Sequence, residues 1–236
     1  MTHSREFLTV KTSNVIDRPV RQHARSRSRG RVNQQEARSE RSRAQILRAA
    51  LKLFSTRGYH GTSVRDIAEL ARVSTGNVYH QFPEKESIFN TLLEQYWEAL
   101  SQPELPFNKA LAEGAFPDDL EKLARAARES VDKYRRYVAL IYVDVVEFEG
   151  THIRRFYADM ANRFQAFLEA NRDHVALDRL RDDVPPLTAI MLASRFFMQY
   201  YGVELLFGVP NHFGVDDETA LKQIVDILKF GMFKRS

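Results

Sequence analysis

Apolar residues recur every three or four positions along most of the chain, which is the spacing of one face of an α-helix. A β-branched run at 138–146 could form a strand, but no partner strand is visible, so a helix is expected there. The pattern therefore predicts an all-α fold of about nine helices. The segments that carry the pattern are approximately 44–57, 64–71, 75–81, 85–100, 118–133, 134–149, 151–171, 186–207 and 216–233.

Residues 1–43 lack this pattern and hold most of the excess positive charge. They contain eleven Lys or Arg and four Asp or Glu, a net charge of +7, against +4 for the whole chain. With almost nothing apolar to bury, this segment is predicted to be a disordered arm. Two interpretations stay open: a solubilising tail, or an arm that contacts phosphates or the minor groove of DNA.

Several classes of protein are excluded or disfavoured by composition. The chain has no cysteine, which excludes disulfides, thiol catalysis and cysteine-ligated metals. No glycine-rich phosphate loop, nucleophile elbow or zinc-ligand pair is present, so neither an enzyme nor a cofactor is predicted. No secretory signal is found, and Arg195 and Glu204 interrupt the most apolar stretch, 187–209. A soluble, cytoplasmic protein without a membrane partner is expected.

Residues 44–82 have the pattern of a helix-turn-helix unit. The first helix is followed by Gly58 as a stop signal, and the short helices at 64–71 and 75–81 are separated by a tight turn. Val78 and Phe82 would hold the third helix against the other two. Its opposite side would then present hydrogen-bonding groups to the major groove of DNA.

The string TSVRDIAELARVSTGNVYHQFPEKESIF, residues 62–89, resembles the TetR family of bacterial transcriptional regulators. Eleven positions match the pattern of that family in register, and helix 1 fits as well, so the resemblance covers about 44–100. Two positions depart from it. Arg72 stands where the turn usually has Gly, and would be strained if a positive φ is needed there. Gln81 replaces the aromatic residue or His before Phe82. The matching positions are Thr62, Ile67, Ala68, Ala71, Val73, Ser74, Gly76, Tyr79, Phe82, Lys85 and Glu86.

The resemblance implies three parts: the arm 1–43, a helix-turn-helix domain at 44–88, and an effector-binding and dimerisation domain at 89–236. It implies phosphate contacts by Tyr79 and Lys85 and base-facing roles on the third helix. Helix N-termini at Thr62 and Ser63 also favour a phosphate. The predicted DNA-binding residues are Thr62, Ser63, Ser74, Thr75, Asn77, Tyr79, His80 and Lys85.

The C-terminal part is rich in aromatic residues and Met, of which most would be core and a subset could line an apolar ligand pocket. Asp144 and Glu147 lie on an apolar helix, where either arginines or a cationic ligand would satisfy them. A metal site at Glu147, Glu149 and His152 is a weaker alternative. The arginines in question are Arg135, Arg154 and Arg195. The predicted ligand-binding residues are Tyr137, Asp144, Tyr157, Met160, Phe164, Met191 and Phe197.

The function predicted from these observations is DNA-binding transcriptional regulation. A homodimeric repressor would bind a pseudo-palindromic operator in double-stranded DNA, and a small, largely apolar effector would release it. Two alternatives remain: a DNA-binding activator, and a nucleoid-type protein that coats DNA without a small-molecule effector.

Overall fold

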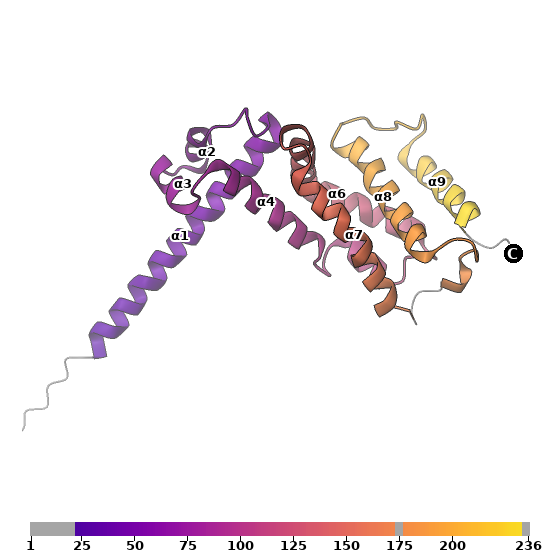
Figure 1. Ribbon diagram of the computed structural model, residues 1–236, viewed down its shortest axis with the longest axis horizontal. Coiled ribbons are helices and arrows are strands. Elements are labelled where there is room, and N and C mark those ends of the chain that lie inside the picture. Colours follow the sequence, from indigo (N-terminus) through magenta and orange to yellow (C-terminus); the bar gives the residue numbers. More distant parts are fainter. Residues whose placement is uncertain (1–21, 173–176, 233–236) are drawn as a thin grey trace, which may run out of the picture. The chain divides into compact units, whose positions relative to one another are not determined.

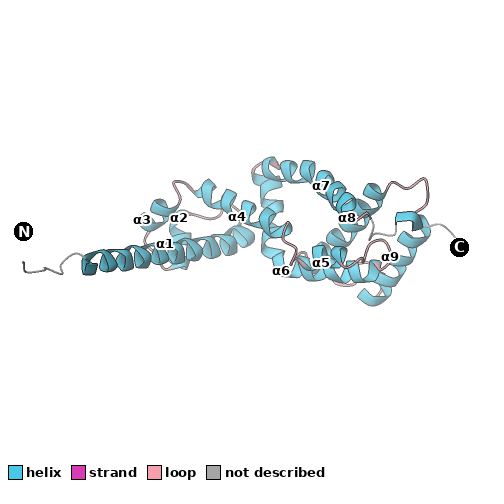
Figure 2. Cartoon of the chain, turned by 90° about the horizontal axis from the view of Figure 1, so that it is seen from below, coloured by secondary structure: helices cyan, strands magenta, loops and turns pink. Residues whose placement is uncertain are grey.

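The computed structural model describes residues 22–172 and 177–232. Within these ranges the chain forms nine α-helices and a short 3-10 helix, Leu177–Arg179, and no strand (Figures 1 and 2). The all-α prediction is therefore confirmed. The helices are α1 Gln22–Arg57, α2 Val64–Ala71, α3 Thr75–Gln81, α4 Lys85–Leu100, α5 Pro106–Ala112, α6 Leu120–Glu147, α7 Thr151–Ala170, α8 Pro186–Leu205 and α9 Asp217–Met232.

Two predictions in the middle of the chain are wrong, although the predicted number of about nine helices agrees with the nine α-helices of the described residues. The sequence pattern predicts a linker at 101–117, but Pro106 begins α5, because proline at the first helical position sacrifices no internal hydrogen bond. The segments 118–133 and 134–149, predicted as two helices, form the single helix α6, since no Gly or Pro interrupts it. The β-branched run 138–146 is helical, as predicted.

The N-terminal arm also differs from expectation in its described part. Residues 22–43 belong to α1 rather than being disordered. Arg, Gln, Glu and Ala are all favourable in helices, and no proline occurs between Gln22 and Arg57. Residues 1–21 of the predicted arm lie outside the described residues. The chain divides into two units, Met1–Arg41 and Ser42–Ser236.

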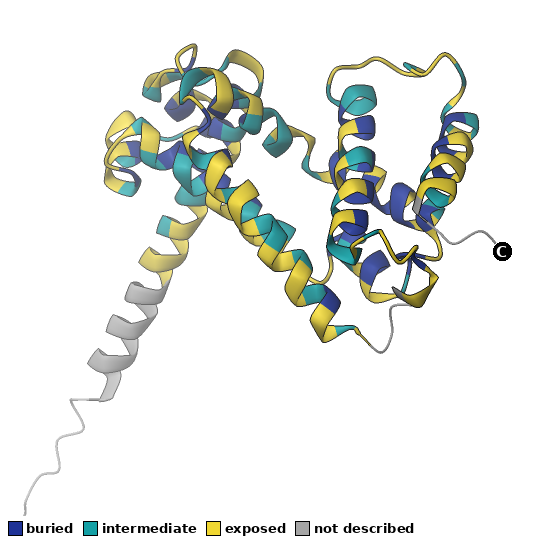
Figure 3. Ribbon diagram, turned by 45° about the vertical axis from the view of Figure 1, so that its right-hand side comes forward, coloured by how far each residue is buried: buried dark blue, intermediate teal, exposed yellow. Residues whose placement is uncertain are grey.

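Two hydrophobic cores fill the part of the chain from Ser42 onward. The first joins α1 to α4 and includes Leu140 of α6, with Phe148 packed against it. The second joins α5 to α9 and is centred on residues such as Phe197 and Tyr201. Figure 3 shows the buried and exposed sides of these helices. Because α6 contributes to both cores, it connects the helix-turn-helix region with the C-terminal helices.

No helix within residues 22–172 and 177–232 has both the length and the apolar character needed to cross a membrane.

Candidate nucleic-acid interface

Helix α2 begins with a reciprocal capping arrangement. The Ser63 hydroxyl accepts a hydrogen bond from the Asp66 N–H at 3.1 Å, and the Asp66 carboxylate accepts one from the Ser63 N–H at 2.9 Å. These bonds satisfy backbone donors that the first helical turn leaves free. The hydrogen bonds from Ser63 also hold the pKa of Asp66 below its ordinary value. Ser63 itself stays exposed, as a phosphate-binding N-terminus requires.

The turn between α2 and α3 places Arg72 in the left-handed region, with φ 57° and ψ 43°. Its N–H donates to the Glu69 carbonyl, and the Val73 N–H donates to the Ala68 carbonyl. This double closure is the usual way to end a helix on a left-handed residue, and glycine normally occupies that position. The expected strain at Arg72 is thus present: a side chain costs about 1–2 kcal/mol in this conformation.

Helix α3 presents one polar face and buries the other. Val78 and the following Phe82 are 1% and 2% exposed and fix the helix against the first core. Ser74 caps it by accepting from the Asn77 N–H at 3.1 Å. The predicted contacts of α3 therefore come together on its outer side. Ser74, Thr75, Tyr79 and His80 are exposed there, and Asn77 is half-buried.

Arg43 supports α3 from α1. Its guanidinium lies 4.2 Å from the centre of the Phe82 ring, and Nη1 donates to the Gln81 carbonyl at 3.2 Å. The cation thus closes the carbonyl end of α3, where positive charge is favourable. The sequence pattern assigns Arg43 to the arm and so misses this role. The signal that could have identified it is spacing, because Arg43 precedes Ile46 and Leu47 by three and four residues and shares their buried face.

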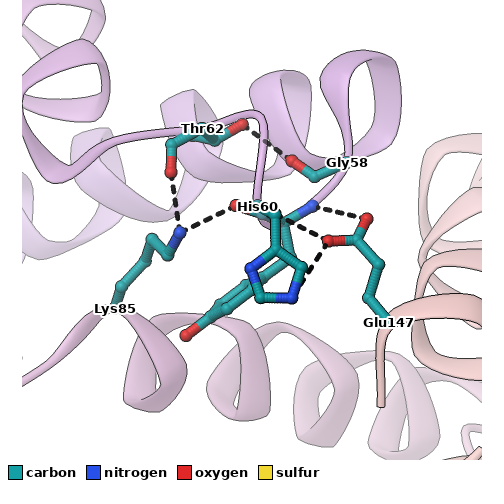
Figure 4. A network of polar contacts seen from close by, with 6 residues as sticks. Gly58, His60, Thr62, Lys85 and Glu147 are labelled. Carbon is teal, nitrogen blue, oxygen red and sulfur yellow. Dashed lines mark hydrogen bonds and ion pairs between the residues drawn. The ribbon is translucent and has the colours of Figure 1, made fainter. Parts of the chain in front are cut away.

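Two of the predicted DNA contacts are turned inward instead. Thr62 is 1% exposed and its hydroxyl donates to the Gly58 carbonyl at 2.9 Å, so its side chain does not reach a phosphate. The Lys85 ammonium donates to the carbonyls of Tyr59 and Thr62 at 2.8 and 2.9 Å (Figure 4). Burial lowers the pKa of Lys85, and the negative charge of Glu147 opposes this effect. The ammonium also lies 4.0 Å from the centre of the Tyr59 ring, so the turn surrounds it on several sides.

The acidic pair on α6 has partners that the sequence did not suggest. Asp144 is fully buried, accepts from the Ile153 N–H at 2.9 Å and lies 2.5 Å from Nδ1 of His152. Glu147 accepts from the N–H groups of Tyr59 and His60 at 3.0 and 2.6 Å. Backbone N–H groups and histidine thus take the place of the expected arginines. Asp144 accordingly supports the start of α7 from inside the protein.

The other predicted ligand residues are spread over different environments. Phe197 is fully buried in the second core, whereas Met160, Phe164 and Met191 are half-buried. Tyr157 is 45% exposed, with the Arg195 guanidinium 4.7 Å from its ring centre.

Tyr137 belongs to a group of stacked aromatic rings. It stacks on Tyr96 of α4, with ring centres 5.5 Å apart, and the neighbouring Trp97 stacks on Phe156 of α7 at 4.2 Å. Among the described residues no group of three or more His, Asp or Glu is arranged to hold a metal.

A capped α2, a left-handed turn and a short α3 with an exposed polar face define a helix-turn-helix DNA-binding protein. Residues 46–92 match the profile of the family described as bacterial regulatory proteins, tetR family. Over 196 residues the chain is 28% identical to the HTH-type transcriptional repressor KstR2 of Rhodococcus jostii (strain RHA1), covering 80% of this chain and 90% of that protein. Residues 46–92 therefore form a DNA-binding domain of the TetR family of bacterial transcriptional regulators, which are DNA-binding proteins and not enzymes.

Two further relatives extend the comparison. The HTH-type transcriptional repressor NicS of Pseudomonas putida is 30% identical over 123 residues, which is 50% of this chain and 54% of that protein. The ketosteroid transcriptional regulator KstR2 of Mycobacterium tuberculosis has the same fold, with a TM-score of 0.53 and 21% identity over 82% of this chain and 95% of that chain. The likeness to NicS thus spans only about half of that relative.

Proposed function

We propose that the protein is a homodimeric repressor that binds a pseudo-palindromic operator and is released by a small, largely apolar ligand. The observation that carries the proposal is the exposed polar face of α3, held in place by the buried Val78 and Phe82. Two relatives are named transcriptional repressors, which supports repression rather than activation.

Base reading is assigned to Thr75, Asn77 and His80, whose side chains carry the donors and acceptors that pair with base edges. Tyr79, which is 53% exposed, and the backbone N–H groups that the cap at Ser63 leaves unpaired in the first turn of α2 contact phosphates. Ser74 caps α3 and offers its hydroxyl at the same edge. The role of Lys85 changes: it holds the turn before α2 through the carbonyls of Tyr59 and Thr62.

Selection from a random pool of double-stranded DNA tests this reading of α3. The full chain is expected to enrich two half-sites about one helical turn apart, roughly 10 base pairs. His80→Ala should relax the preference at one position of each half-site at a cost of about 1–3 kcal/mol. Tyr79→Phe should weaken binding to all sequences alike. Glu94→Gln, on the exposed side of α4, is the control. Equal affinity for every sequence would instead favour a DNA-coating protein.

The ligand part of the proposal rests on the aromatic rings between α4 and the C-terminal helices. Tyr96 and Trp97 lie in α4, which begins directly after the helix-turn-helix, and they stack on α6 and α7. An apolar molecule bound among these rings would displace α4 and so move α2 and α3. The measurement is a screen of apolar compounds for a raised Tm. A compound that raises Tm yet leaves the selected DNA fully bound would contradict effector release.

A further inference from the structure

The turn between α1 and α2, residues 58–62, is held by a carboxylate from a distant part of the sequence. Glu147 is the last residue of α6, and its two oxygens accept from the N–H groups of Tyr59 and His60 at 3.0 and 2.6 Å (Figure 4). These residues are separated from Glu147 by 88 and 87 positions in the sequence. The interaction joins the element that spans both cores to the turn that leads into α2.

The turn is shaped for this carboxylate. Gly58 has φ +76°, and a Cβ atom built there would lie 2.4 Å from Oε1 of Glu147. Any side chain at this position would therefore push the carboxylate away from the two N–H groups. Glycine is needed at 58 for the backbone conformation and again for the approach of Glu147.

A positive charge holds the opposite side of the same turn. The Lys85 ammonium donates to the carbonyls of Tyr59 and Thr62, while Glu147 accepts from the N–H groups. The turn is thus held on one side by the start of α4 and on the other by the end of α6. The ammonium faces peptide carbonyls and the carboxylate faces peptide N–H groups, so each charge meets the end of the peptide dipoles that has the opposite sign. Ser63, the cap of α2, follows directly.

The position of Glu147 is in turn tied to α7. This helix begins at Thr151, four residues after Glu147, and its Ile153 N–H donates to the buried Asp144, about one turn before Glu147. Phe148 stacks on Phe89 of α4, with ring centres 4.8 Å apart. A shift of α6 or α7 is therefore passed to the turn at 58–62 through a short set of direct contacts.

We infer that Glu147 is the positioning residue that couples the C-terminal helices to the DNA-reading unit. This inference rests on the proposed function, because it concerns how the state of one region biases DNA binding in the other. Coupling of this kind is reciprocal: if a change at α7 alters DNA affinity, DNA binding must alter the stability of α7 by the same factor. The effect can therefore be measured without an effector.

The experiment is amide hydrogen exchange on the full chain, with and without the double-stranded DNA fragment that it selects from a random pool. In the wild type, DNA is expected to slow exchange at 58–62 and in the first turn of α7 by about fivefold or more, the lower range of allosteric coupling. In Glu147→Gln, which replaces one acceptor oxygen by a donor, the change at α7 should fall below about twofold. Protection of α2 and α3 by DNA should remain. If Glu147 only stabilised the structure, its substitution would change DNA-induced protection at α7 and at α2 and α3 together.

Two variants complete the design. Glu149→Gln removes a charge from the same corner at an exposed position and should behave as the wild type. Gly58→Ala breaks the interaction from the turn side, so its effect should not add to that of Glu147→Gln. Loss of DNA selection by the wild type would refute the proposed function. Normal selection with DNA-induced protection confined to α2 and α3 in the wild type, or unchanged transmission in Glu147→Gln, would overturn the coupling role alone.

Discussion

At the scale of single residues, the most unusual position is Arg72, a large side chain in a conformation that favours glycine. The turn keeps its shape because the hydrogen bonds from Arg72 and Val73 close α2. The strain is therefore stored within the DNA-reading unit. Its exposed guanidinium stands beside the start of α3 in the sequence, where a phosphate contact would compensate for the strain.

Arg72→Gly is expected to raise the free energy of unfolding by up to about 1 kcal/mol, because relief of the left-handed strain exceeds the extra entropy of glycine in the unfolded chain. Urea unfolding followed by circular dichroism measures the change. Arg65→Gly, the same replacement inside α2, should instead lower stability by about 1 kcal/mol. A loss of stability in both variants would show that the turn is not strained.

At the scale of elements, α3 is too short to be stable by itself and depends on what holds its two ends. Ser74 closes its N-terminus and Arg43 its C-terminus, while Val78 fixes its middle. The positions of the base-reading side chains consequently depend on these three contacts. Arg43 is therefore part of the reading unit, although it makes no contact with DNA in our assignment.

Arg43→Ala should lower the free energy of unfolding by about 1–2 kcal/mol, through loss of a hydrogen bond and of the cation–π interaction with Phe82. Chemical unfolding at fixed salt measures this change. Arg41→Ala removes the same charge two residues earlier, at an exposed position, and should change stability by less than about 0.5 kcal/mol. Equal losses in the two variants would contradict a specific role for Arg43.

The elements also show what periodicity can and cannot predict. The bounds of α3 and α4 follow from local chemistry and were predicted from the sequence. The environment of Glu147 was not, because its partners are backbone N–H groups, which nearly every residue carries and which no side-chain pattern marks. The continuity of α6 was missed for a related reason: burial on two sides makes one helix look like two segments of different character.

At the scale of the whole molecule, the proposed homodimer would use apolar groups that the single chain leaves exposed. Leu192 of α8 is 50% exposed, and Ile227 and Phe230 of α9 are each 71% exposed. Large apolar side chains exposed on two neighbouring helices are typical of a protein–protein interface. Two copies joined there would present two α3 helices to one operator, which a pseudo-palindrome requires.

Ile227→Asp should shift the chain from dimer to monomer, because an unpaired carboxylate would be buried at the interface. Light scattering during gel filtration measures the mass. Leu70→Glu, at a 43% exposed position of α2, is the control and should leave the dimer intact. A wild type that is monomeric at all concentrations would contradict the proposed dimer, as would an unchanged mass for Ile227→Asp.

The basic N-terminal segment adds charge to the molecule as a whole. Deletion of residues 1–41, which leaves Arg43 in place, should lower DNA affinity and reduce the slope of log K against log salt by about 0.9 for each phosphate that the segment neutralises. The order of preference among DNA sequences should be unchanged. Binding isotherms at several salt concentrations supply both quantities. If sequence preference disappears with the segment, base reading does not reside in α3.

The glycine at 58 has a consequence for how such a protein can be rearranged. Because Gly58 has no side chain, the carboxylate of Glu147 in α6 fits beside it. The first four helices therefore leave a space at this turn for an acidic side chain of the C-terminal region. A transplanted reading unit would lose the core contact with Leu140 of α6 and, on our inference, its response unless the recipient ends its sixth helix in an acidic residue. Exchange of the C-terminal region of this protein therefore requires this one acidic side chain, in addition to the fit of the larger surfaces.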